Sequence, residues 1–344
     1  MEQEWKSLRF QMNSNYTPVS QFLFVGFTGQ QQMPQLIGTF FLFIYILTLV
    51  GNLFILHTVR KVKKLHTPMF IMIMNLAASD IIYSTTVSPQ MIYFYLTGFK
   101  EIQFHMCFVQ MFFLHFAGCV DSYLMAAMAI DRFVSICYPL RYPTILSNSV
   151  AYKMCAVAWI AGIVVPLLLV LYSFPLPYCG PNKIVHFYCQ HGQVARLACT
   201  DTSLTLTRAL ILGFIVLLGS FFIILLSYLK IIIAVIKIVT KDSKEKAFYT
   251  CSTQLIVVMI YYIPRLFSYA SLSVSFNIPT DLITALGVSY CVLPPLVNPI
   301  IYSYRTQEIR NVFFKKNSSA KIIPKNEKNE HGLKEGKRNS TRVK

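Results

Sequence analysis

The chain has 344 residues, of which 55% are hydrophobic and only 13% are charged, and its mean hydropathy is +0.53. A soluble protein carries about 25% charged residues, so this composition excludes an ordinary soluble protein and indicates a membrane protein with several spans. The formal net charge is +17, but the Lys and Arg residues gather in a few loops and in the tail. The charge therefore reflects membrane topology, and no nucleic-acid partner is expected.

Seven apolar blocks are each long enough to cross about 30 Å of hydrocarbon as a helix. The runs are continuously apolar rather than alternating, which favours helices over a β-barrel. The sequence therefore predicts an all-α membrane protein, a seven-transmembrane helix bundle. The expected spans are Leu36–Val59, Pro68–Leu96, Phe104–Ile136, Met154–Ser173, Arg208–Val239, Lys246–Ser273 and Leu282–Tyr304.

The segments outside the transmembrane domain (36–304) are too short for a further domain. Residues 1–35 have no apolar core after a basic start, so the first span rather than a cleaved signal peptide is expected to direct insertion. Residues 305–316 place Ile309, Val312, Phe313 and Phe314 on one side, which predicts a short amphipathic eighth helix on the inner membrane surface. Residues 317–344 are polar, basic and aperiodic, which predicts a disordered cytoplasmic tail.

Positive residues mark one set of loops. They follow the first span at Arg60 and Lys61, and they recur after the third span, between the fifth and sixth spans, and in the tail. The positive-inside rule places the C-terminus in the cytoplasm and, with seven spans, the N-terminus outside the cell. The triplet that begins at Asn15 is then an N-glycosylation sequon on the outer side of the plasma membrane.

The nine cysteines divide by compartment. Cys107 lies at the outer start of the third span, and Cys179, Cys189 and Cys199 lie in the long loop before the fifth. These four face an oxidising environment and can pair, and the sequence alone allows three connectivities. The other five fall in spans or on the reducing side and are expected to be small buried residues.

A series of short motifs follows the predicted spans in order, and together they resemble those of olfactory receptors, a family of rhodopsin-like G-protein-coupled receptors. The resemblance runs from about Phe22 to Phe314. One such motif is a weak signal, whereas the whole set in order and at the family's spacing is specific. The motifs are Gly51-Asn52, Leu65–Phe70, Met128–Tyr142, Tyr178–Asn182, His186–Cys189, Ser227-Tyr228, Lys246–Phe248, Thr250–Ser252 and Pro295–Ser303.

The resemblance implies an odorant receptor. It would bind a small molecule in an outer helical cavity and activate a stimulatory, olfactory-type heterotrimeric G protein, which raises cyclic AMP. A rhodopsin-like receptor for a non-odorant metabolite or hormone is the alternative within the same fold, and a transporter would require duplicated halves that the sequence lacks. No nucleophile–base set, metal-ligand spacing or phosphate loop occurs in the sequence, so an enzyme is not expected.

The resemblance also implies disulfide pairings and activation residues. It pairs Cys107 with Cys189 and Cys179 with Cys199, which would hold a lid over the outer mouth. It assigns Asp131 and Arg132 to a local ion pair that releases Arg132 to the G protein on activation. The companion residues of this switch are Asn298, Pro299, Tyr302 and Tyr228.

Two carboxylates, Asp80 and Asp121, lie in the middle of spans, where each costs about 2.5–3.5 kcal/mol on insertion scales. The resemblance places both with Asn52 and Asn298 around a small cavity that holds sodium, since oxygen ligands suit a hard cation. A protonated, hydrogen-bonded pair of carboxyl groups without sodium is the alternative. No other cofactor is expected.

The ligand cavity is expected between the outer halves of the third, fifth, sixth and seventh spans, and its apolar character suits a small volatile or weakly polar ligand. On the third span the spacing of Leu114, Gly118 and Asp121 places them on one inward face. The expected ligand contacts are Leu114, His115, Gly118, Cys119, Ser122, Tyr262, Arg265, Leu266 and Tyr269.

Arg265 is unusual because it follows Pro264 inside a span. If its side chain points inward it can pair with a ligand carboxylate, which leads to the hypothesis that the ligand is an anion. If it extends outward to the membrane surface it is only an anchor. The sequence leaves both orientations open.

Overall fold

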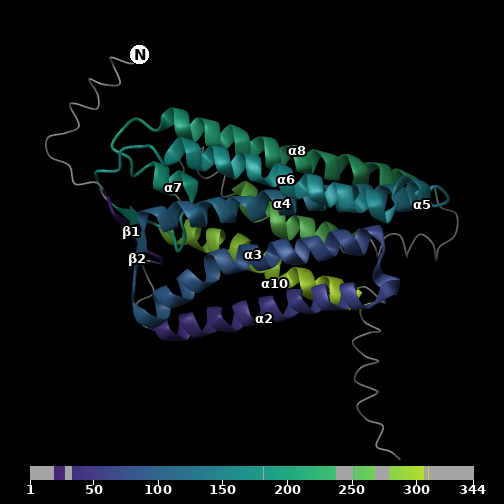
Figure 1. Cartoon of the computed structure of the whole chain (residues 1–344), viewed down its shortest axis with the longest axis horizontal. Coiled ribbons are helices and arrows are strands. Elements are labelled where there is room, and N and C mark those ends of the chain that lie inside the picture. The colour runs from purple at the N-terminus through teal and green to yellow at the C-terminus, as the bar shows by residue number, and fades with distance from the viewer. Residues whose placement is uncertain are drawn as a thin grey trace, which may run out of the picture.

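A computed structural model of the chain describes residues 19–27, 33–180, 182–237, 251–252, 254–267, 279–305 and 309. Long helices lie side by side along one axis (Figure 1). Six of them are long and apolar enough to span a membrane, and a shorter apolar helix covers Gln254–Phe267. The long helices are α2 (Pro34–Lys61), α3 (Pro68–Thr97), α4 (Phe104–Cys137), α6 (Asn148–Ser173), α8 (Ser203–Ile236) and α10 (Thr280–Arg305), and the short ones are η1 (Lys63–Leu65), α5 (Tyr142–Ile145) and α7 (His191–Ala195). The predicted bundle of membrane-spanning helices is confirmed.

Two helices begin earlier than their apolar runs. α6 starts at Asn148 rather than Met154, because the Ser147 side chain caps it by accepting a hydrogen bond from the Val150 N–H at 3.4 Å. α8 starts at Ser203 rather than Arg208, and the Arg208 guanidinium lies 5.2 Å from the centre of the Tyr172 ring. Hydropathy therefore marks the membrane-embedded part of a helix better than it marks the helix end. Parts of the expected sixth span, Lys246–Ser273, lie outside the described residues.

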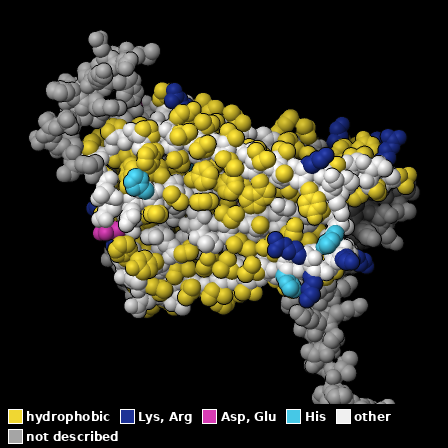
Figure 2. Space-filling view, viewed as in Figure 1, with side chains coloured by type: hydrophobic (Ala, Val, Ile, Leu, Met, Phe, Trp, Pro, Cys, Tyr) yellow, Lys and Arg dark blue, Asp and Glu magenta, His cyan; other side chains and the backbone are white. Residues whose placement is uncertain are grey.

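α4 is the central helix, and it packs against α3, α6 and α8. Its side chains Val120, Leu124 and Met128 are completely buried. The peripheral helices α2, α6 and α8 instead expose large apolar side chains, and Figure 2 shows an almost continuous apolar surface along the middle of the bundle. Because water would not solvate such a surface, this is the face of a multi-pass membrane protein toward lipid.

The charged side chains are distributed unevenly. In the view of Figure 2, Lys and Arg gather mainly at the end of the bundle where α5 lies. We call this the α5 end. The opposite end carries the strands and α7.

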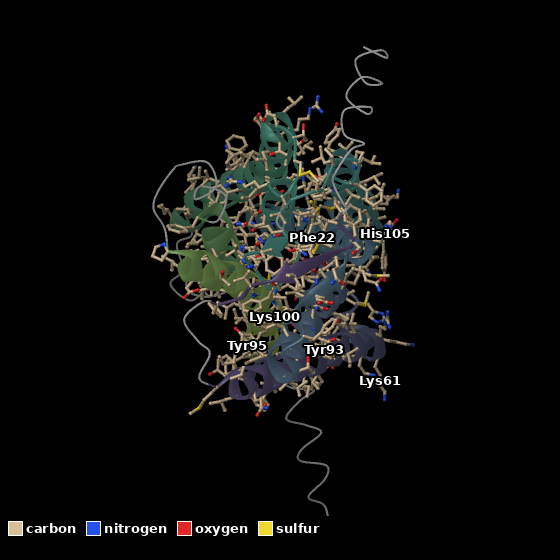
Figure 3. The ribbon with its side chains drawn as sticks, turned by 90° about the vertical axis from the view of Figure 1, so that its left-hand side faces the viewer. Phe22, Lys61, Tyr93, Tyr95, Lys100 and His105 are labelled. Atoms are coloured by element: carbon tan, nitrogen blue, oxygen red, sulfur yellow. A yellow bond between two sulfur atoms is a disulfide. The ribbon has the colours of Figure 1, made fainter. Side chains whose placement is uncertain are left out.

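A small sheet covers that opposite end. The strand β1 (Gln21–Phe24) lies between β2 (Glu101–Gln103), to which it is antiparallel, and β3 (Lys183–Ile184), to which it is parallel. Phe22 of β1 is fully buried, and Figure 3 shows this strand crossing the ends of the helices. Strands of two to four residues are too short to produce a period-two pattern, so the sequence did not predict them.

Two disulfides hold the loop between α6 and α8 in place. Cys107 at the start of α4 is bonded to Cys189, and Cys179 is bonded to Cys199, which are the pairings that the resemblance implies. We call β1, β2 and the loop from Phe174 to Thr202 the lid. The remaining five cysteines are free, and four of them are buried.

The expectations for the two ends of the chain remain predictions. Asn15 and the tail 317–344 lie outside the described residues. The expected amphipathic helix 305–316 is described only at its first residue and at Ile309, which is helical and buried.

Candidate functional site

A cavity of about 400 Å³ lies beneath the lid. Its walls come from α4, α6, α7, α8 and the helix Gln254–Phe267, and Tyr83 of α3 and Tyr290 of α10 also reach it. This volume is in the range of pockets that bind small molecules. The cavity is thus large enough for a small ligand and is built mainly from spanning helices.

α4 supplies one wall, and all five of its predicted ligand contacts reach the cavity: Leu114, His115, Gly118, Cys119 and Ser122. The His115 Nδ1 donates to the Met111 carbonyl at 2.8 Å, so in the neutral ring Nε2 is left as an acceptor. The Ser122 hydroxyl donates to the Gly118 carbonyl at 3.0 Å and shares a 2.9 Å hydrogen bond with the Tyr261 hydroxyl.

The predicted contacts on the sixth span divide differently. Arg265 lines the cavity, but Tyr262 and Leu266 are absent from the described residues that line it. Tyr262 is buried against the Phe221 ring at 5.4 Å, and Leu266 packs against the main hydrophobic core. Leu266 follows Arg265 directly in sequence and therefore projects from another side of this helix. Tyr269 lies outside the described residues.

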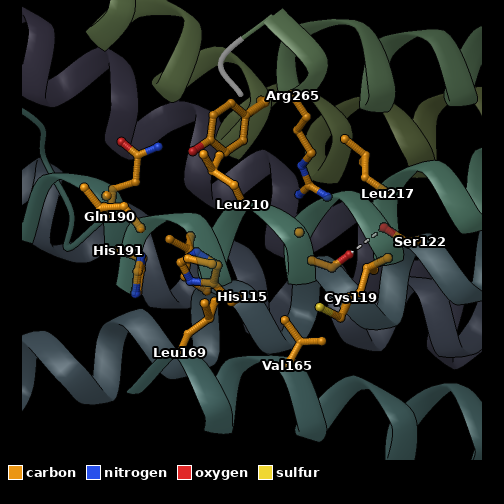
Figure 4. A pocket seen from close by; sticks show the side chains of 18 of the residues that line it. His115, Cys119, Ser122, Val165, Leu169, Gln190, His191, Leu210, Leu217 and Arg265 are labelled. Carbon is orange, nitrogen blue, oxygen red and sulfur yellow. Dashed lines mark hydrogen bonds between the residues drawn. The ribbon is translucent and has the colours of Figure 1, made fainter. Parts of the chain in front are cut away.

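The orientation of Arg265 is inward, so an anchor at the membrane surface is excluded. The side chain is only 8% exposed, and Figure 4 shows its guanidinium directed into the cavity. The guanidinium carbon lies 3.7 Å from the centre of the Tyr261 ring, 5.4 Å from that of Tyr83 and 5.6 Å from that of Tyr290. Gly118 adjoins the guanidinium, since a Cβ at that position would lie in ordinary contact, 3.5 Å from both of its terminal nitrogens.

The wall from α8 was missed by the sequence analysis. Because α8 is apolar almost throughout, no amphipathic pattern marks its inward face. Its polar residues give no clear signal either, because Ser203 and Thr207 are among the described residues that line the cavity whereas Thr205 and Ser220 are not. The α8 residues that line it are Ser203, Leu206, Thr207, Ala209, Leu210, Gly213, Val216 and Leu217.

The lid also contributes to the wall, through Gln190, His191, Gly192 and Arg196. The ring of His191 lies with Nε2 at 2.7 Å from the Ser173 hydroxyl. Burial, assisted by nearby His115, lowers the pKa of His191 to about 3, so the ring is neutral at physiological pH. The lid therefore shapes the cavity directly.

At the α5 end, the arrangement around Arg132 differs from the expected ion pair. The Asp131 carboxylate is buried and accepts a hydrogen bond from the Tyr142 hydroxyl at 2.7 Å. Within the described residues, no ion pair within 4.0 Å joins Asp131 and Arg132, and the Arg132 Nε has no partner. In this conformation the Asp131 carboxylate instead accepts from a neutral donor, Tyr142 of α5, and the ion pair with Arg132 stays a prediction. Burial and the adjacent carboxylate raise the pKa of Tyr142, which keeps its hydroxyl protonated.

The companion residues lie in the interior of the bundle. Tyr228 donates to the Cys251 carbonyl at 3.4 Å, and the Tyr302 hydroxyl lies 4.0 Å from the Met128 sulfur. Pro299 packs against α2, where a Cβ at Gly51 would lie 2.9 Å from its ring. No hydrogen bond joins Tyr228 to Tyr302 in the described part of the chain.

Comparison with known proteins decides the family. Residues 41–319 match the family profile described as olfactory receptor. The chain belongs to the olfactory receptor family. Its relatives include human olfactory receptor 10C1, 37% identical over 91% of this chain and 99% of the relative, and human olfactory receptor 4D1, 40% identical over 86% and 94%. Mouse olfactory receptor 4B13 is 34% identical over 87% of this chain and 96% of the relative. The protein is therefore a multi-pass membrane protein of a family of G-protein-coupled receptors.

The expected sodium site of this olfactory receptor is formed only in part. Asp80 accepts a hydrogen bond from the Asn298 amide at 2.9 Å, and the Asn52 amide donates to the Thr48 and Pro295 carbonyls at 2.9 Å each. A narrow cleft joins Asn52, Asp80 and Asn298, but it has no volume for a water-sized particle, and Asp121 does not line it.

Asn52, Asp80 and Asp121 each have one buried oxygen without a hydrogen-bond partner among the residues that the structure describes. These oxygens are chemically suited to a hard cation, yet the residues do not fit one in this closed arrangement. Sodium binding stays a prediction. The alternative, a hydrogen-bonded pair of the two carboxyl groups without sodium, also stays a prediction.

Proposed function

We propose that this olfactory receptor binds a small odorant in the cavity beneath the lid and activates a stimulatory heterotrimeric G protein, which raises cyclic AMP. The cavity carries the proposal. It combines an apolar wall from α6 and α8 with a small number of polar groups, which is the usual composition of a small-molecule site.

The helix α4 carries both cavity-lining residues and Arg132, at different points along its length. Leu114 and Ser122 of α4 line the cavity, and Arg132 lies further along α4, toward the α5 end. A ligand that binds one packing of the helices better than another shifts the population toward that packing. The Arg132 guanidinium, which is not held by Asp131, is then available to the G protein at the α5 end.

We further propose that the receptor lies in the plasma membrane with the lid outside and the α5 end in the cytoplasm. Disulfides hold the lid, as suits an oxidising compartment, and Lys and Arg gather at the α5 end, as suits the cytoplasmic side. In this orientation Asn15 lies outside the cell and carries a glycan.

The test is cyclic AMP production in cells that express the receptor, measured across an odorant panel in parent cells and in cells that lack stimulatory G-protein α subunits. We expect at least one odorant to raise cyclic AMP only when both the receptor and the α subunit are present. A response that persists without the α subunit would contradict the assigned G protein. Surface expression without a response to any odorant, together with no odorant that stabilises the purified receptor, would contradict odorant binding.

A further inference from the structure

A permanent positive charge is buried at the side of the cavity. The pKa of a guanidinium is too high for it to lose its proton in a protein, and a charged side chain in the middle of a membrane span is costly unless something compensates it. Arg265 is 8% exposed, and among the described residues no carboxylate lies within the 4.0 Å of an ion pair with it. The site therefore holds a cation without an adjacent anion.

The surroundings hold this guanidinium in one position. The centre of the Tyr261 ring lies 3.7 Å from the guanidinium carbon, a favourable distance for a cation–π contact, and two further tyrosine rings lie within 6 Å. The Tyr261 hydroxyl is fixed in turn by Ser122 and the Gly118 carbonyl. A group that is held before the ligand arrives loses little freedom on binding, which favours affinity.

The cavity has no negative group of its own. The described residues that line the cavity include no Asp or Glu but two arginines, Arg265 and Arg196, of which Arg196 is exposed. Asp121 lies about one helical turn beyond Gly118 and is not among the residues that line the cavity. Its carboxyl group offsets part of the Arg265 charge from outside the cavity. The lining side chains together leave an excess of positive charge that faces the ligand.

The opposite wall is apolar. Val165 and Leu169 of α6 face the cavity across from Arg265, as Figure 4 shows, and Leu210, Val216 and Leu217 of α8 adjoin them. An apolar wall opposite a single cation suits a ligand with one anionic end and one hydrocarbon end.

We propose that the ligand is a small organic anion, whose carboxylate pairs with the Arg265 guanidinium and whose hydrocarbon part lies between α6 and α8. A guanidinium can donate two parallel hydrogen bonds to a carboxylate, and such charge-assisted bonds are among the strongest in proteins. The choice of ligand class rests on the proposed odorant function, but the binding itself is measurable without a G protein.

The experiment uses straight-chain carboxylates from propanoate to octanoate, each compared with the alcohol and the primary amide of the same carbon number. Binding is measured as the rise in the thermal denaturation midpoint of the purified full-length receptor at neutral pH, and signalling is measured as cyclic AMP in cells. We expect at least one carboxylate to bind at least about tenfold more tightly than its matched alcohol and amide, the size of effect that a lost charge-assisted bond produces.

Three variants test the role of Arg265. Arg265→Gln removes the charge and is expected to abolish the preference for carboxylates, whereas Arg265→Lys keeps the charge without the two-pronged geometry and should retain part of it. Gly118→Ala provides a second test in case Arg265→Gln does not fold. Its methyl group fits at 3.5 Å from the guanidinium, so the receptor should fold while carboxylates bind less tightly.

The outcomes separate this inference from the proposed function. Carboxylate binding without cyclic AMP would support the inference and contradict the G-protein assignment. Cyclic AMP in response to neutral odorants alone would support the odorant function and overturn the inference. The inference is also overturned if no carboxylate stabilises the receptor, or if Arg265→Gln, folded and at the same surface level, keeps the full preference.

Discussion

Two buried carboxylates of this receptor each accept a hydrogen bond from a neutral donor rather than pairing with a cation. Asp131 accepts from the Tyr142 hydroxyl and Asp80 from the Asn298 amide, while Arg132 and Arg265 have no acidic partner within 4.0 Å in the described part of the chain. A neutral hydrogen bond contributes only about 0.5–1.5 kcal/mol net, so such a contact can be exchanged for another at small cost. This is the energy scale on which a ligand can shift a conformational population.

The Tyr142–Asp131 hydrogen bond leads to the first prediction. Tyr142→Phe removes the donor, so Asp131 becomes free to pair with Arg132 and the resting conformation should gain stability. We expect basal cyclic AMP to fall about two- to tenfold at equal surface level. Tyr138→Phe is the matched control, because Tyr138 lies in the same segment with an exposed ring. A rise in basal cyclic AMP in Tyr142→Phe would show that the hydrogen bond restrains Arg132 rather than releases it.

At the scale of helices, close approach between neighbours depends on glycine at particular positions. A Cβ at Gly162 of α6 would lie 2.6 Å from the Val120 Cγ2 of α4, and Val120 is fully buried with a stiff side chain. On α8, by contrast, nothing lies within 4 Å of a Cβ built at Gly219. The two glycines therefore sit in the interiors of comparable helices but in opposite packing environments.

This contrast gives the second prediction. Gly162→Ala should lower the free energy of unfolding by about 1–3 kcal/mol, because a well-packed contact would be overfilled. Gly219→Ala should leave stability unchanged or raise it by up to about 1 kcal/mol, since alanine favours a helix over glycine. Thermal denaturation of the two purified variants measures the difference. Equal midpoints would mean that α4 and α6 do not pack this closely.

The sequence predicted the helices more completely than the site. Long apolar runs identify the spans, and the inward face of α4 could be predicted because Leu114 and Gly118 follow helical spacing. The face of α8 could not, because apolar residues surround that helix on all sides. The Tyr142–Asp131 hydrogen bond was not predicted because it joins α4 to the short helix α5, and no pattern within either segment indicates it.

At the scale of the whole molecule, the lid contains two buried histidines, His186 and His191, and His191 contacts Ser173 at the end of α6. His186 is 1% exposed, its ring stacks on the Tyr188 ring at a centroid distance of 5.1 Å, and neither ring nitrogen meets the distance and angle of a hydrogen bond with a described residue. Burial lowers the pKa of His186 to about 4, and that of His191 to about 3. An unfolded histidine titrates near pH 6.5, so below that pH the unfolded chain binds protons that the folded lid does not.

The third prediction is that the free energy of unfolding decreases as the pH falls from about 6.5 toward 4. Above about pH 6.5 the contribution of the two neutral histidines to stability is complete. Thermal denaturation across this range measures the slope. His186→Phe should reduce the slope, because phenylalanine keeps the stacking on Tyr188 and cannot bind a proton. His105→Phe is the control, since His105 is exposed. A slope that is equal in both variants would show that His186 does not contribute.

The central claim is that ligand binding beneath the lid is transmitted to a G protein through Arg132. The most direct measurement compares the receptor with Arg132→Ala at equal surface level, recording both cyclic AMP and the ligand-induced rise in thermal denaturation midpoint. We predict that Arg132→Ala keeps the stabilisation by ligand and loses the cyclic AMP response, because the cavity residues are unchanged while the contact at the α5 end is removed. A full cyclic AMP response from Arg132→Ala would contradict the account.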